Sequence, residues 1–200
     1  MKNLESACRA KRKSGGILVS RNVIDRRACK SLVAIYDRHH RRATRFDYNG
    51  KPILNYRDLK SCSSEKTTTF LRELAMHCRR LIEGQVRARN LFLESIWIAR
   101  LDPGGLLIPH ADNERQEGTS WVPSHTPQRH YTVLLYLNDT FKGGQLVFPD
   151  LDTTIVPKPG LLVGFPSGHE FMHAVRKVRS GKRYNVAIWF TKRSKHALRV

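Results

Sequence analysis

The second half of the sequence is a series of short apolar segments separated by turns. From residue 91 onward the apolar pattern has the two-residue period of strands, and glycine or proline follows most segments. We expect about eight short strands, the clearest at residues 94–100, 106–112, 129–138 and 183–191. Many short strands with such turns favour a double-sheet jelly roll, also called a double-stranded β-helix. We therefore predict an α+β fold whose jelly-roll core spans residues 91–192.

Two helices are expected ahead of these strands. Apolar residues recur at helical spacing through residues 22–38 and again through residues 69–86. A short apolar run at residues 17–19 predicts one strand before the first helix. Residues 17–90 should therefore form a mainly helical support for the core.

Three segments are expected to lack regular structure. Residues 1–15 form a loose basic tail, and residues 43–66 are polar and irregular. Residues 113–128 contain one glycine and two prolines, which predicts an exposed loop. Since no long linker or internal repeat divides the chain, residues 1–200 should form a single domain.

The chain is strongly basic, with 36 Lys and Arg, 17 Asp and Glu, and a formal net charge of +19. Residues 1–100 carry 23 of the basic and 9 of the acidic residues, and residues 101–200 carry 13 and 8. This balance favours an anionic partner such as a nucleic acid or an acidic substrate. The charges are scattered along the chain, however, and a well-solvated surface explains them equally well.

A cytoplasmic location is expected. The charged residues 1–16 lack the apolar stretch of a secretory signal, and no uncharged apolar segment approaches the roughly 18 residues that predict a membrane span. The cysteines show no CxxC spacing and fit reduced thiols: Cys8, Cys29, Cys62 and Cys78. We therefore expect no membrane partner.

The candidate metal ligands lie in two of the predicted strands. His110 and Asp112 are two residues apart, so in an extended strand both side chains point to one face. His173 follows 61 residues after Asp112 and could face this motif across the two sheets. Two histidines and one carboxylate form a facial triad, which leaves positions open on an iron(II) ion. The HxD pattern alone is a weak signal, and the later histidine strengthens it.

A carboxylate-binding site is expected beside this triad. Arg183 follows His173 by ten residues, across the turn at residues 180–181. A guanidinium can hold a carboxylate with two parallel hydrogen bonds. The hydroxyls of the preceding strand could complete such a site: Tyr131, Thr132 and Tyr136.

With these motifs in order, the sequence resembles the Fe(II)- and 2-oxoglutarate-dependent oxygenases of the prolyl hydroxylase group. Within that group it resembles the catalytic domain of the prolyl 3-hydroxylases, the leprecan type. The segments that carry the resemblance are residues 110–113, 129–139, 141–148, 155–160 and 165–191.

The resemblance implies roles for five residues. His110, Asp112 and His173 would be the iron ligands. Arg183 would bind the distal carboxylate of 2-oxoglutarate, with Tyr136 as a second contact. The cofactors implied are Fe(II), 2-oxoglutarate and O2, with ascorbate as an optional reductant.

Several neighbouring residues leave alternatives open. Lys182 is the basic residue next to Arg183, but strand alternation places it on the opposite face. Other residues are candidates for pocket walls or for contacts to the ligands, and core or surface positions explain them as well: Val175, Trp189, His169 and Glu170.

The resemblance implies hydroxylation of an unactivated C–H bond, in a prolyl residue or in an amino acid or peptide. Two alternatives within the same fold are a nucleic-acid oxygenase or demethylase, which the charge favours, and a hydroxylase of small molecules such as natural products. A non-catalytic double-sheet binding module is a third, disfavoured because all three candidate ligands and the arginine are present.

Overall fold

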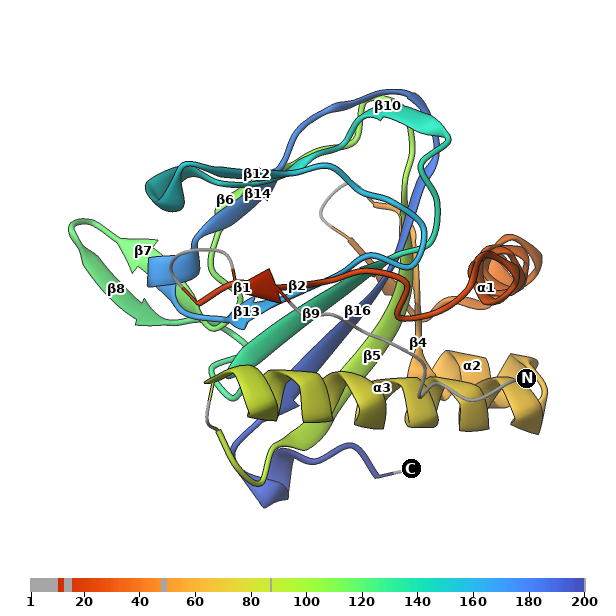
Figure 1. The fold of residues 1–200 in the computed structure, drawn as a ribbon, viewed down its shortest axis with the longest axis horizontal. Helices are drawn as coiled ribbons and strands as arrows, with labels where there is room; N and C mark the ends of the chain where they lie inside the picture. Colours follow the sequence, from red (N-terminus) through yellow and green to blue (C-terminus); the bar gives the residue numbers. More distant parts are fainter. Residues whose placement is uncertain (1–10, 13–15, 48–49, 87, 200) are drawn as a thin grey trace.

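Two β-sheets face each other, and helices cover the outer face of the larger sheet (Figure 1). The computed structural model of the chain describes residues 11–12, 16–47, 50–86 and 88–199. The predicted basic tail, residues 1–15, therefore lies mostly outside the described residues. No helix in the described ranges is both long and apolar enough to cross a membrane.

The larger sheet has eight antiparallel strands. In spatial order they are β1 (Lys11–Arg12), β2 (Leu18–Ser20), β13 (Leu162–Pro166), β9 (Tyr131–Tyr136), β16 (Arg183–Thr191), β5 (Phe92–Leu101), β4 (Pro52–Asn55) and β3 (Arg45–Phe46). The smaller sheet has four, β12 (Thr153–Ile155), β11 (Leu146–Phe148), β14 (His173–Val175) and β6 (Leu107–His110). Two ribbons complete the fold: β10 (Phe141–Gly143) with β15 (Val178–Gly181), and β7 (Glu114–Glu117) with β8 (Ser120–Pro123).

Strand alternation on the larger sheet creates two separate cores. All nine residues of β16 are buried. Val186 and Ile188 pack among the helices, whereas Ala187 and Trp189 face the smaller sheet. The core between the two sheets is the one that encloses the candidate site.

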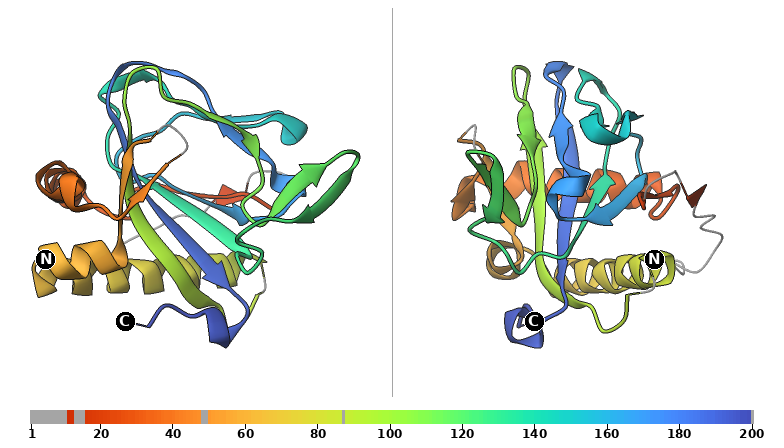
Figure 2. Two further views of the ribbon diagram at one scale, coloured as in Figure 1. Left: turned by 180° about the vertical axis from the view of Figure 1, so that it is seen from behind. Right: turned by 90° about the vertical axis from the view of Figure 1, so that its left-hand side faces the viewer.

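The two predicted helices are present, with shifted starts. Helix α1 (Arg26–His39) begins after Asp25, whose side chain accepts a 2.7 Å hydrogen bond from the backbone N–H of Ala28. The helix cannot start earlier, because Asn22 has a left-handed φ of 56°. Helix α3 (Glu65–Val86) begins ahead of its apolar stripe and runs along the outer face of the larger sheet (Figure 2). Four 3-10 turns complete the helices: η1 (His40–Arg42), η2 (Pro149–Leu151), η3 (His169–Phe171) and η4 (Ser194–His196).

The prediction that residues 43–66 are irregular was wrong. This segment forms β3, β4 and helix α2 (Tyr56–Cys62). Asn55 and Asp58 form a capping box that starts α2, and Leu54 of β4 is fully buried beside β5. The residues expected to support the core thus also contribute strands to the larger sheet.

The prediction that residues 113–128 form a loop was also wrong in part. Residues 114–117 pair with residues 120–123 in an antiparallel hairpin. The turn contains Gly118 at a φ of +58°, a conformation that glycine adopts without strain. The hairpin is mostly polar and exposed, so burial gives it no apolar period to read from the sequence.

Candidate active site

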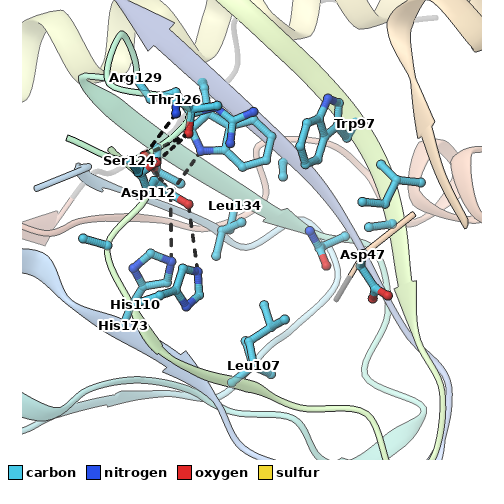
Figure 3. Close-up of a pocket in the computed structure, with 18 of the residues that line it drawn as sticks. Asp47, Trp97, Leu107, His110, Asp112, Ser124, Thr126, Arg129, Leu134 and His173 are labelled. Atoms are coloured by element: carbon cyan, nitrogen blue, oxygen red, sulfur yellow. Dashed lines mark hydrogen bonds and ion pairs between the residues drawn. The ribbon is translucent and has the colours of Figure 1, made fainter. Parts of the chain in front are cut away.

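The three candidate ligands converge at one end of the cavity between the sheets (Figure 3). His110 ends β6, and His173 begins β14, its hydrogen-bonded neighbour, in register. Nε2 of His110 lies 3.9 Å from Oδ1 of Asp112, and Nε2 of His173 lies 4.0 Å from Oδ2. The three ligand atoms all lie within 4.8 Å of one another. His173 therefore lies beside the motif in the same sheet, and the expectation that it faces the motif across two sheets was wrong.

Backbone carbonyls fix both imidazoles. Nδ1 of His110 lies 2.7 Å from the carbonyl oxygen of Ile108, and Nδ1 of His173 lies 3.2 Å from that of Phe171. A carbonyl oxygen only accepts hydrogen bonds, so Nδ1 carries the proton in each ring. When neutral, each ring held in this way presents an unprotonated Nε2 toward Asp112, as metal-binding histidines do.

Two donors hold the carboxylate of Asp112. Its Oδ2 accepts hydrogen bonds from Oγ1 of Thr132, at 2.5 Å, and from the indole Nε1 of Trp189, at 3.0 Å. Asp112 itself follows the end of β6, and its backbone carbonyl accepts hydrogen bonds from Ser124 and Thr126. Residues of β9 and β16 thus orient the carboxylate, and the loop that contains Ser124 and Thr126 holds the backbone of Asp112.

The protonation states suit metal binding. Burial by itself raises the pKa of Asp112, but His173, His110 and the two hydrogen bonds lower it below its usual range. Burial also lowers the pKa of His173. At neutral pH Asp112 is therefore a carboxylate and His173 a neutral imidazole, the forms that coordinate a metal ion.

A buried guanidinium without a counter-ion lies at the other end of the cavity. Arg183 is 2% exposed, its Nε donates to the carbonyl of Gly144 at 3.0 Å, and its Nη1 donates to Oδ1 of Asn185 at 2.9 Å. No carboxylate in the described part of the chain forms an ion pair with it, and burial lowers its pKa. Such a charge calls for an anionic ligand, because an unpaired buried charge is costly.

Tyr136 supplies a second free polar group at this place. Its ring lies 5.0 Å from the guanidinium carbon of Arg183. Each side chain influences the pKa of the other, yet among the described residues neither the Tyr136 hydroxyl nor Nη2 of Arg183 has a hydrogen-bond partner of acceptable geometry. A carboxylate bound here could accept from both. Lys182, the alternative basic residue, is exposed and lies on the opposite face of the chain.

One cavity of about 690 Å³ joins the triad to this arginine. Its walls are mainly apolar: Trp97, Leu107, Leu134, Val175, Ala187 and Trp189. Val175 and Trp189 thus line the pocket, which was the first of the two alternatives, pocket wall or core position. Thr132 was expected in the carboxylate site, but it binds Asp112 instead, and Tyr131 packs on the helical side of β9. Alternation along β9 explains the position of Tyr131, whereas Thr132 shares the inward face with Tyr136 and lies four residues away from it, at the Asp112 end of the cavity.

Sequence reasoning missed the group that supports Trp189. The guanidinium of Arg129 lies 3.9 Å from the ring centre of Trp189 and 4.8 Å from that of Trp97. Its Nε is 3.2 Å from Oε2 of Glu94, so its charge is compensated. Arg129 lies two residues before β9, at the start of the predicted apolar segment 129–138, and this is the sequence signal that could have suggested an inward position.

His169 and Glu170 lie beside Glu114 of the β7–β8 hairpin, and neither is among the residues that line the cavity. Oε2 of Glu114 lies 2.8 Å from Nδ1 of His169 and accepts a 2.9 Å hydrogen bond from its backbone N–H. The ring of Trp121 stacks on His169, with centroids 5.1 Å apart. These contacts tie the β7–β8 hairpin to η3, and neither residue contacts Asp112.

Comparison with known proteins gives consistent matches. Residues 96–191 match the model of the 2OG-Fe(II) oxygenase superfamily. Human prolyl 3-hydroxylase 2 is 36% identical over 135 residues, which cover 62% of this chain and 17% of that protein. The chain spans about a fifth of the length of the prolyl 3-hydroxylase 2 sequences it matches.

Solved structures share the fold at low sequence identity. A viral collagen prolyl hydroxylase from Paramecium Bursaria Chlorella virus-1 superposes with a TM-score of 0.63 and 18% identity, covering 93% of this chain and 98% of that one. A Pseudomonas putida prolyl-4-hydroxylase gives a TM-score of 0.66 and 20% identity, covering 90% and 95%. The predicted jelly-roll core with N-terminal helices is confirmed.

Proposed function

Because the chain belongs to the 2OG-Fe(II) oxygenase superfamily, we propose that it is an Fe(II)- and 2-oxoglutarate-dependent dioxygenase that hydroxylates a prolyl residue in a peptide or protein. One observation carries the proposal. A triad of two histidines and one carboxylate shares a cavity with a buried arginine that has no counter-ion among the described residues. The first group suits iron(II), and the second suits the distal carboxylate of a dicarboxylic acid.

One group of side chains would bind the metal, and a second group would bind the co-substrate. Nε2 of His110, Nε2 of His173 and the carboxylate of Asp112 would hold the iron. Bound Fe(II), with 2-oxoglutarate and O2, supplies the oxidising power for hydroxylation and releases succinate and CO2. Thr132 and Trp189 occupy Oδ2 of Asp112, which leaves Oδ1 available to the metal.

Arg183 and Tyr136 would anchor the distal carboxylate of 2-oxoglutarate. The bonds from Arg183 to Gly144 and Asn185 fix the guanidinium plane, so that Nη2 remains available in the cavity. The apolar side chains of Leu134 and Ala187 exclude water between this anchor and the triad.

The substrate class rests on the relatives. Several relatives with significant sequence similarity are named prolyl 3-hydroxylases, and one solved neighbour is a prolyl hydroxylase in complex with a peptide fragment. The cavity opens between β3 and the β7–β8 hairpin, and residues from both line it, which suits a chain that passes across the mouth. A peptidyl proline is therefore the substrate we propose.

The test is succinate release with Fe(II), 2-oxoglutarate and a panel of proline-containing peptides, with and without ascorbate. Mass spectrometry should show one added oxygen atom on the peptide. His110→Ala and Arg183→Ala should lose this turnover, whereas Lys182→Ala, at the exposed neighbouring position, should retain it. Full turnover in a folded His110→Ala protein would refute the proposal.

A further inference from the structure

A strongly basic segment borders one side of the cavity mouth. Residues 38–46, here called the basic rim, contain four arginines, two histidines and no acidic residue. Arg41, Arg42 and Arg45 are all exposed, and none of them forms an ion pair within the described ranges. The rim continues into the cavity, because Arg45 and Phe46 are among its lining residues.

The basic rim is held in place by a buried carboxylate. Asp58 is 3% exposed and accepts hydrogen bonds from the Thr44 hydroxyl, at 2.7 Å, and from the Thr44 backbone N–H, at 3.3 Å. Arg45 and Phe46 pair with β4 as the last strand of the larger sheet. Phe46 is 63% exposed beside the three arginines. The rim therefore presents its charges from a fixed backbone.

The cations deeper in the cavity are already compensated. Arg129 is paired with Glu94, and Nε of Arg100 lies 2.8 Å from Oδ1 of Asp102. Arg183 is the exception, and the proposed co-substrate would compensate it. The interior thus suits an uncharged group between the apolar walls, and the unpaired positive charge that remains lies outside, on the rim.

The opposite side of the mouth has a different charge. The β7–β8 hairpin lies there, on the left in Figure 1, whereas α1, which leads into the rim, lies on the right. Glu114 of the hairpin contacts His169, and Glu117 contacts Arg115. Since Glu170 is exposed nearby, this side has no surplus of positive charge. The mouth is therefore polarised: the β3 side has a net positive charge even though Asp47 also lines the cavity there, and the hairpin side has none.

We propose that the polypeptide substrate carries an acidic stretch on one flank of the hydroxylated residue, and that this stretch docks on the basic rim. The proposal rests on the proposed function. A neutral residue would enter the apolar cavity while its acidic flank meets Arg41, Arg42 and Arg45. A nucleic acid fits less well, because it carries a phosphate at every step and would bring phosphates against Glu114 and Glu117 as well.

The experiment compares three peptides with the same central proline: one with acidic residues before it, one with acidic residues after it, and one neutral. One acidic peptide should show a KM about tenfold lower than the neutral peptide, with kcat within about twofold, because charges at a rim mainly affect encounter and docking. The advantage should shrink in about 0.5 M salt. Binding of labelled peptides to the Mn(II)- and 2-oxoglutarate-loaded protein, measured by fluorescence anisotropy, should show the same order.

The variant R41E/R42E, which keeps the cavity-lining Arg45, should remove most of the advantage of the acidic peptide and leave turnover of the neutral peptide. R41Q/R42Q is a second variant that adds no negative charge at the end of α1. The matched control is R26E/R27E, which makes the same charge change on exposed residues roughly 20 Å away along the helix. The control should keep the preference.

Equal KM and equal binding for acidic and neutral peptides would overturn the proposal, as would an equal loss in the control variant. Rim-dependent binding of an oligouridine that acidic peptides fail to displace would show a nucleic-acid surface instead. Failure of every peptide to be hydroxylated would refute the proposed function. In that case the anisotropy measurement still decides whether the rim selects acidic peptides.

Discussion

Trp189→Phe should weaken metal binding although residue 189 is not itself a ligand. The substitution keeps an aromatic ring in the cavity but removes the indole N–H, which lies 3.0 Å from Oδ2 of Asp112. A hydrogen bond to a charged group contributes about 1.5–3 kcal/mol, and Thr132 keeps the other bond to the same oxygen. We therefore expect the dissociation constant of Mn(II) or Fe(II) to rise about 10- to 100-fold, as it does when a partner that orients a ligand is lost.

The assay is an anaerobic calorimetric titration of the apoprotein with Mn(II) at saturating 2-oxoglutarate. Trp97→Phe is the matched control, because Trp97 packs against Trp189 with ring centres 4.5 Å apart but donates no hydrogen bond to Asp112. The control should bind metal within about twofold of the unaltered protein. Unchanged affinity in Trp189→Phe, or an equal loss in both variants, would refute the argument that the indole N–H orients the carboxylate.

Arg183→Lys should raise the KM for 2-oxoglutarate about 30-fold or more, measured by succinate release, because an ammonium group lacks the planar fork that binds a carboxylate with two hydrogen bonds. Gly144→Ala should lower the free energy of unfolding by about 1–2 kcal/mol and also raise that KM. Gly144 has a φ of +65°, and a Cβ added there would lie only 2.9 Å from the Phe141 ring and 3.0 Å from Cδ of Arg183. Urea denaturation checks the stability, and succinate release checks the KM. Asp58→Ala should lower the free energy of unfolding by about 2–4 kcal/mol in urea, because the donors of Thr44 lose their buried acceptor. A smaller loss than in an exposed Asp→Ala control would contradict this account of the basic rim.

The inward faces of the strands could be predicted from the sequence. Alternation places Arg183 and Trp189 on one face of β16, and the structure has both in the cavity. It also places Tyr136 and Thr132, which are four residues apart, on the same face of β9. These predictions depend only on the two-residue period of a strand, which holds wherever the strand is paired.

The pairing of distant strands could not be predicted in this way. His173 lies next to His110 because β14 and β6 are neighbours, a register that no local pattern encodes. Asp112 lies beyond the end of β6, and its orientation depends on partners 20 and 77 residues away. The capping box at Asn55 is different, because Asn55 and Asp58 are three residues apart and the pattern is local.

Strand β16 sets a limit on how this protein can change length during evolution. Arg183 and Trp189 are six residues apart, which is roughly 20 Å along a strand. Inserting or deleting one residue between them would turn one of the two toward the helices, because successive side chains alternate. The turn at Gly118 lies outside this strand and carries no such constraint. Among descendants of this chain, we therefore expect insertions to accumulate around the mouth of the cavity. We expect none in β16 between Arg183, which would bind the co-substrate, and Trp189, which holds the metal ligand Asp112.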